Sequence, residues 1–192
     1  MDDQRAEIIE GLNVFRALEC WGATLYAAWA AREPDPRLRA GHLIIAEREA
    51  THARLLAERM RALGAEPRPA CVDYILSAQL AELQHIEGFV AQLDGLRRCT
   101  ERDKAQMAGC QLALDRGREA AQQTDPTTHR LLAQLYSEEK VSAAWYRHTY
   151  SEVTGRRPIS AALPLLDPDQ VVRRADSTRA VAAVAAACAA VA

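Results

Sequence analysis

The segment Glu47-Arg-Glu-Ala-Thr-His52 lies inside a run of sequence that predicts one long helix. Glu49 and His52 are three residues apart, so they share a helix face and lie less than one turn from each other. That face is otherwise apolar, with Ile45, Leu56 and Leu63. A carboxylate and an imidazole on a buried face are costly unless they are paired, and a metal ion is one such partner. The alternative is a simple ion pair, because many helices contain E-x-x-H by chance.

The composition predicts an all-α fold. The chain of 192 residues has only nine glycines, many alanines and almost no β-branched runs. Its net charge of −2, with both signs mixed throughout, gives no electrostatic reason to expect nucleic-acid binding. No apolar run reaches the roughly 20 residues that are needed to span a bilayer, so no membrane span is predicted.

The cysteines predict free thiols in a reducing compartment, and hence a cytoplasmic location. Their odd number, their wide spacing and the absence of a signal peptide support this prediction; they are Cys20, Cys71, Cys99, Cys110 and Cys188. No C-x-x-C pair occurs, which argues against a rubredoxin-type iron site or a zinc knuckle. If the chain is an oxidoreductase, its electrons would therefore come from a separate donor protein.

Helix start and stop signals divide the chain into five predicted helices, over about residues 3–31, 36–63, 72–97, 100–123 and 126–155. Asp35-Pro36 and Asp125-Pro126 each combine an N-cap with a proline in the first turn, and Gly64 and Gly155 follow helix ends. Thr100 is the predicted N-cap of the fourth helix. Residues 1–155 would form an antiparallel bundle of four core helices plus one additional long helix. The Ala-rich segment 156–192 would be an irregular tail of short helices packing on the bundle or on a neighbouring subunit.

Further polar residues interrupt the apolar stripes of the other helices. Because short turns make neighbouring helices antiparallel, residues equidistant from a turn lie at one level of a bundle. This argument places six residues in a slab about one helical turn thick: Glu19, Glu49, His52, Glu82, His85 and Glu139. Four carboxylates and two imidazoles suit iron or manganese, and bridging glutamates suit two ions rather than one.

The stretch from Ile44 to Gly64 resembles the second helix of the ferritin-like, rubrerythrin-type carboxylate-bridged di-iron superfamily, and Glu19 resembles its first-helix ligand. In that superfamily, one glutamate from each of two helices and an E-x-x-H from each of the other two project into the bundle core. The resemblance covers about residues 5–155. It implies two iron ions, or a Mn/Fe pair, held by the six residues above. It also implies an O₂- or peroxide-dependent oxidoreductase or hydroxylase, with an unknown small-molecule substrate and a possible homodimer.

The sequence departs from this pattern at Ser142, which stands where the second E-x-x-H would have its histidine. His148 projects from the opposite side of the same helix, so His85 is the expected source of the second nitrogen. If the third helix is instead a crossover, Asp115 would replace Glu82 and His85. Loss of part of the site would leave a non-catalytic interaction protein on the same scaffold, and iron storage is a less favoured third function.

Aromatic residues and one further histidine lie close to these positions in the sequence. Tyr26 and Tyr146 follow Glu19 and Glu139 by two turns, where each could hydrogen-bond a ligand glutamate. Such residues are more often part of a core or an interface than substrate contacts. His42 lies seven residues before Glu49 and is expected at the end of the bundle rather than in the metal site.

Overall fold

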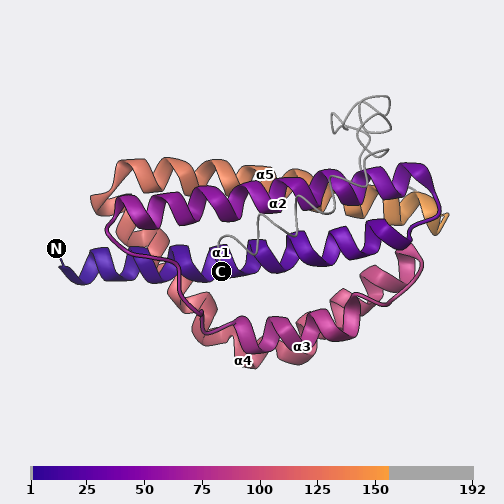
Figure 1. Ribbon diagram of the computed structural model, residues 1–192, viewed down its shortest axis with the longest axis horizontal. Helices are drawn as coiled ribbons and strands as arrows, with labels where there is room; N and C mark the ends of the chain where they lie inside the picture. The colour runs from indigo at the N-terminus through magenta and orange to yellow at the C-terminus, as the bar shows by residue number, and fades with distance from the viewer. Residues whose placement is uncertain (1, 156–192) are drawn as a thin grey trace.

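The computed structural model describes residues 2–155, and its regular structure there consists of five α-helices (Figure 1). They are α1 (Asp2–Arg32), α2 (Pro36–Ala62), α3 (Asp73–Leu83), α4 (Phe89–Thr124) and α5 (Pro126–Val153). The predicted all-α fold is confirmed for this part of the chain. The tail helices predicted after residue 155 lie outside the described residues.

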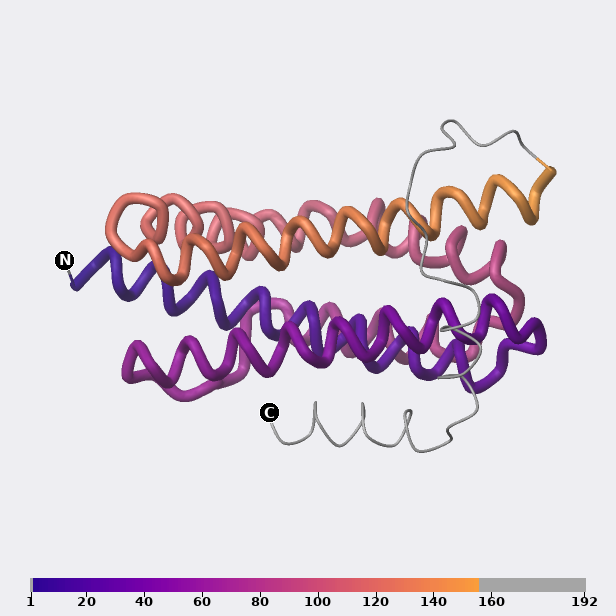
Figure 2. The backbone as a smooth tube through the Cα atoms, turned by 90° about the horizontal axis from the view of Figure 1, so that it is seen from above, coloured from indigo at the N-terminus to yellow at the C-terminus, as the bar shows by residue number. Residues whose placement is uncertain are grey.

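The four long helices form a bundle in which α1 and α5 run in one direction while α2 and α4 run in the other (Figures 1 and 2). α1 packs against α2, α3 and α4, and α5 packs against α4 and α2. Since α2 and α4 are parallel, the chain must return along the whole bundle between them. Residues 63–88, which include α3, make this return, and their first part crosses beside α1 (Figure 1). Side chains of α1 hold this crossing, because Arg16 donates to the Arg68 carbonyl oxygen and Asn13 accepts from the Arg68 amide.

The predicted ends of α2 and α5 are confirmed. The Asp35 carboxylate accepts from the amides of Arg37 and Leu38, and the Asp125 carboxylate accepts in the same way at the start of α5. These bonds satisfy amides that have no partner inside the helix.

The predicted division of the third and fourth helices is wrong. The third helix ends at Leu83, and the fourth begins at Phe89 rather than at Thr100. Gly88 has φ +83°, a conformation that glycine adopts without strain, and it breaks the helix there. The Thr100 hydroxyl donates to the Leu96 carbonyl oxygen within α4, so it does not cap a helix start. The additional helix is therefore short, with 11 residues, and α4 is one of the four long helices.

α1 and α4 approach each other closely through two glycines. A Cβ atom added to Gly117 would lie 2.9 Å from the Gly11 Cα, which no real Cβ contact tolerates. The missing side chains bring the two backbones together, and this contact fixes where α4 crosses α1.

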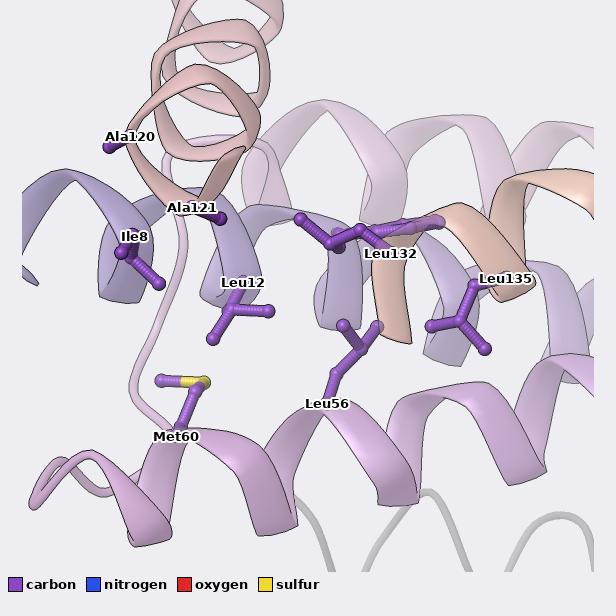
Figure 3. Packing of buried hydrophobic residues seen from close by; sticks show 9 residues of the cluster. Ile8, Leu12, Leu56, Met60, Ala120, Ala121, Leu132 and Leu135 are labelled. Carbon is purple, nitrogen blue, oxygen red and sulfur yellow. The ribbon is translucent and has the colours of Figure 1, made fainter. Parts of the chain in front are cut away.

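The hydrophobic core at one end of the bundle joins all four long helices (Figure 3). Ile8 and Leu12 of α1 and Leu56 and Met60 of α2 meet side chains from the other two helices; these are Ala120, Ala121, Leu132 and Leu135. Burying a Leu, Ile or Met side chain contributes about 1.5–3 kcal/mol each, so this cluster stabilises the helix ends next to the polar site.

The expectation that all the cysteines are free thiols is wrong for two of them. Cys71, in the crossover, forms a disulfide with Cys110 of α4, while the buried Cys99 is a free thiol. Cys188 lies outside the described residues. The argument for a reducing compartment therefore loses the support that it drew from the cysteines, and a cytoplasmic location stays a prediction.

None of the helices between residues 2 and 155 is both long and apolar enough to cross a membrane.

Candidate metal centre

Three helices bring a group of metal-ligating side chains together in the bundle. Glu19 of α1, His52 of α2 and Glu139 of α5 each offer one donor atom, and these atoms all lie within 4.8 Å of one another. The His52 Nδ1 atom is 3.1 Å from Glu19 Oε2 and 3.3 Å from Glu139 Oε1. Glu19 and His52 are almost fully inaccessible, with 2% and 1% of their side chains exposed.

Glu49 lies next to this group, and a glycine makes room for it. A Cβ on Gly22 of α1 would come within 2.9 Å of Glu49 Oε2, so the carboxylate occupies the space that a side chain would fill. Glu49 is buried and hydrogen-bonds Glu19, and its charge acts on Tyr26. The predicted proximity of Glu19, Glu49, His52 and Glu139 therefore agrees with the structure.

Glu138, which the sequence analysis did not single out, completes the surroundings of His52. Its Oε2 atom lies 2.8 Å from His52 Nε2, on the side of the ring away from Glu19 and Glu139. A carboxylate that accepts the second ring N–H of a ligand histidine fixes its tautomer and raises its basicity. Neither periodicity nor spacing could reveal this role, because Glu138 is adjacent to Glu139 and is partly exposed.

Burial and mutual repulsion determine the electrostatics of the group. Burial is the largest cause that raises the pKa of Glu19 and, more strongly, that of Glu49. Burial alone would lower the pKa of His52, but its close contacts with the carboxylates of Glu139, Glu19 and Glu138 outweigh burial and raise the pKa to about 10. The hydrogen bond from His52 lowers the pKa of Glu138. Glu19 and Glu49 therefore resist ionisation unless a cation joins them.

Hydrogen bonds alone do not satisfy all of the nitrogen and oxygen atoms in this group. The His52 Nδ1 atom carries at most one proton, yet two carboxylate oxygens face it. Glu139 Oε1 is buried and receives no hydrogen bond. A metal ion among these atoms would satisfy both carboxylates and the imidazole at once, and oxygen and imidazole ligands suit iron, manganese or zinc. The residues present therefore fit a metal ion.

The structure does not bring Glu82 and His85 to this group. Glu82 is exposed and pairs with Arg102 at 2.7 Å, and the exposed His85 lies 3.4 Å from an Arg32 nitrogen. Their predicted level relied on a short turn between the second and third helices, but ten residues outside any helix separate α2 from α3, and α3 packs against α1 and α4.

Asp115, the alternative ligand, is also outside the group. It is exposed on α4 and contacts Gln111 and Arg118 of the same helix. The residues that surround the group thus come from α1, α2 and α5.

Arg48 occupies the place next to Ser142. The Arg48 Nη1 atom donates to the Ser142 hydroxyl at 2.8 Å and to the Glu138 carbonyl oxygen at 3.2 Å. Burial still raises the pKa of Glu49, and the positive charge of Arg48 only partly offsets this; for Glu138, the hydrogen bond from His52 lowers the pKa and Arg48 adds to the effect. The Arg48 guanidinium therefore lies beside Ser142, the position at which the di-iron pattern would have its second histidine.

An aromatic cluster adjoins the carboxylates further along the bundle. The Tyr146 hydroxyl forms a hydrogen bond with His42 Nδ1 at 3.0 Å. It was expected to hydrogen-bond a ligand glutamate instead. The Tyr26 ring lies 5.4 Å from that of Tyr146, and burial, followed by the charges of Glu49, Glu139 and Glu19, raises the pKa of Tyr26 well above its usual value. His42 is fully buried among these rings, and burial lowers its pKa to about 4. His42 is thus a neutral part of the core.

Comparisons of the chain with models of protein families, with curated proteins and with solved structures gave no match.

Proposed function

We propose that this chain is a metal-binding protein of the ferritin-like, rubrerythrin-type class that uses bound iron as an O₂- or peroxide-dependent oxidoreductase. The observation that carries the proposal is the convergence of the buried Glu19 and His52 with the partly exposed Glu139, in which two carboxylates face one imidazole nitrogen. A four-helix bundle with one long crossover, which is the connectivity of ferritin-like folds, supports the choice of class.

The roles of the residues follow from their positions. Glu19, His52 and Glu139 would hold the ion, and Glu49 would add a carboxylate from the Gly22 side. Glu138 would keep His52 Nδ1 directed toward the ion by accepting the Nε2 proton. Bound iron would supply redox chemistry toward O₂ or peroxide, and manganese is the second candidate metal. The substrate and the electron donor are separate molecules in this proposal.

Metal binding must displace protons from this site. At neutral pH the imidazole of His52 is protonated, because its pKa is about 10, and Glu49 resists ionisation. A metal ion needs a neutral imidazole and ionised carboxylates, so binding releases protons and strengthens as pH rises.

A second candidate function rests on the same protonated His52. Without metal, the imidazolium pairs with Glu19, Glu138 and Glu139, and such a cluster can be purely structural. The chain would then be a non-catalytic helical protein that binds a partner.

Anaerobic titration of the metal-free protein with ferrous iron, followed by elemental analysis, separates the two functions. The proposal expects tight, pH-dependent binding that is lost in Glu49→Gln and in His52→Gln. The control His148→Ala removes a histidine of α5 that pairs with Glu152, and this variant should bind iron as the unaltered protein does. Admission of O₂ should then produce the visible absorption of ferric iron. Absence of bound iron, or equal iron content in all these variants, would favour the structural cluster.

A further inference from the structure

The number of metal ions that the candidate centre can hold depends on the residues that flank it on the side of Ser142. Ser142 lies three residues after Glu139, so it shares the same face of α5, and it is buried. Arg48 lies four residues before His52 on α2 and therefore shares its face. Because α2 and α5 are antiparallel, Arg48 and Ser142 are displaced from His52 and Glu139 in the same direction (Figure 1).

This displacement matches the place of a second ion. Three to four residues of helix correspond to about 4.5–6 Å along the bundle, and paired metal ions lie roughly 3.5–4 Å apart. The nitrogen ligand of a second ion would have to come from position 142 if Glu139 begins an E-x-x-H. Instead, the hydroxyl of Ser142 accepts a hydrogen bond from Arg48 at 2.8 Å.

Two hydrogen bonds hold the Arg48 side chain beside Ser142. One of its nitrogen atoms binds both the Ser142 hydroxyl and the Glu138 carbonyl oxygen, so α2 and α5 are bridged at this level. A guanidinium has five donors and no acceptor, and it stays protonated at any pH at which the protein folds. It therefore cannot become a ligand, and it repels a cation that approaches from this side.

The net charge of the site also favours one metal ion over two. Glu19, Glu49, Glu138 and Glu139 contribute four negative charges when ionised, and Arg48 offsets one of them. One divalent ion leaves a single negative charge, and its oxidation to the trivalent state leaves none. A second divalent ion would give the site a net positive charge, which is unfavourable next to the buried Glu19 and Glu49.

We propose that the Arg48 guanidinium, anchored by Ser142, takes the place of a second metal ion, so that the centre binds one ion. The inference rests on the proposed metal-binding function and narrows it, since a di-iron centre is replaced by a mononuclear one. The chemistry would then be that of a single ion held by glutamates and one histidine, with a fixed cation beside it.

Manganese is a suitable probe, because an isolated Mn²⁺ ion and a coupled pair of ions have different electron paramagnetic resonance spectra. The full-length, metal-free protein is titrated with Mn²⁺ by equilibrium dialysis. We expect one tightly bound equivalent and the spectrum of an isolated ion at every loading. Two tight equivalents, or the spectrum of a coupled pair, would overturn the inference while leaving the metal-binding function intact. No bound Mn²⁺ or Fe²⁺ at all would instead remove the proposed function.

A double variant tests the role of Arg48 directly. Arg48→Gln with Ser142→His removes the cation and restores a nitrogen ligand three residues after Glu139. We expect this variant to bind about two equivalents and to show a coupled pair. The matched control Arg54→Gln removes an exposed α2 arginine paired with Glu58, and it should keep one equivalent. If the folded double variant still binds one ion, Arg48 is not the determinant. If it does not fold, the spectrum of the unaltered protein still decides the nuclearity.

Discussion

At the residue scale, the two ring nitrogens of His52 divide the candidate centre into an inner and an outer side. Nδ1 faces Glu19 and Glu139, where an ion would lie, while Nε2 faces the partly exposed Glu138. Glu138 can therefore act on a metal ion only through the imidazole, as a positioning residue.

Removal of Glu138 should weaken metal binding without removing a ligand. We expect Glu138→Ala to lower the affinity for Mn²⁺ about 10–100-fold, the usual effect of losing such an outer hydrogen bond. Glu138→Gln keeps a carbonyl acceptor for the Nε2 proton and should recover part of this loss. Isothermal titration at several pH values measures the effect, with Glu152→Gln on the same helix as control. Equal affinities for Glu138→Ala and the unaltered protein would show that Glu138 does not act on the metal site.

Gly22 offers a way to disturb Glu49 while the helix itself becomes more stable. In Gly22→Ala, the new Cβ would meet the end of the Glu49 side chain at 2.9 Å, so the carboxylate must move. Alanine favours a helix over glycine by about 0.5–1 kcal/mol, which offsets the cost of this movement. We expect an unchanged or higher melting temperature together with weaker metal binding.

Gly109→Ala is the matched control for Gly22→Ala. Gly109 lies in α4, and a Cβ there would have nothing within 4 Å. This variant should gain the same helix stability and bind metal normally. Full metal affinity in Gly22→Ala would mean that Glu49 does not contribute to the site.

At the element scale, the sequence predicted those features that depend on neighbouring residues in the chain. The Asp-Pro starts of α2 and α5 are local signals, and both were correct. The turn between α3 and α4 has both a local and a distant cause. Gly88 is the local signal, and Gln92 donates to the Ile86 carbonyl oxygen at 3.1 Å. The Trp29 indole N–H of α1 donates to the Leu83 carbonyl oxygen at 2.8 Å, and this distant partner at the end of α3 could not be read from the sequence.

The same contrast holds for the candidate centre. Glu19, Glu49, His52 and Glu139 interrupt apolar stripes, so periodicity could find them. Glu138 and Arg48 contribute because their side-chain rotamers reach a neighbouring helix, and the sequence does not specify these rotamers. The prediction for Glu82 and His85 was wrong because it assumed a short turn after α2, whereas the connection to α3 is long and carries α3 to the side of α1 and α4.

The junction of α4 and α5 should make the protein sensitive to acid. Asp125 caps α5 and also pairs with Arg59 of α2 at 2.5 Å. Burial opposes its ionisation, but hydrogen bonds from Thr128 and Arg59 prevail and lower the pKa to about 2. Since the folded pKa lies below the ordinary value of 3.8, the ion pair stabilises the fold at pH above about 4 and loses this effect as the pH falls to 2.

We therefore expect Asp125→Asn to cost about 2 kcal/mol of unfolding free energy at pH 7 and almost nothing near pH 2. Asparagine is also a good N-cap, so the difference reports the charge rather than the cap. Urea unfolding at pH 7, 4, 3 and 2 measures it. Asp35→Asn, at the corresponding cap of α2, should show a smaller difference. A gap between Asp125→Asn and the unaltered protein that does not change with pH would contradict the assignment.

At the scale of the whole molecule, the candidate centre joins three of the four long helices at a level where the core is polar. The apolar cluster shown in Figure 3 lies at one end of the bundle, and the aromatic cluster around His42 lies on the other side of the carboxylates. Between them, buried carboxylates repel one another when they ionise. In the metal-free bundle, the apolar and aromatic clusters are stabilising, while the carboxylates between them repel one another. A cation that binds between these carboxylates should therefore stabilise the whole fold.

Metal removal should accordingly lower the melting temperature. A ligand that binds only the folded state at 100 times its dissociation constant adds about 2.7 kcal/mol to the unfolding free energy. For a chain of this size, each kcal/mol corresponds to roughly 2–4 °C, so we expect a shift of about 5–10 °C between the chelator-treated and the metal-loaded protein. Differential scanning calorimetry at pH 7 measures this shift. His52→Gln should lose it, while His148→Ala should keep it. If His52→Gln melts at the same temperature as the metal-free protein and still gains stability from metal, the stabilising ion binds elsewhere, and the group between α1, α2 and α5 is a structural ion-pair cluster.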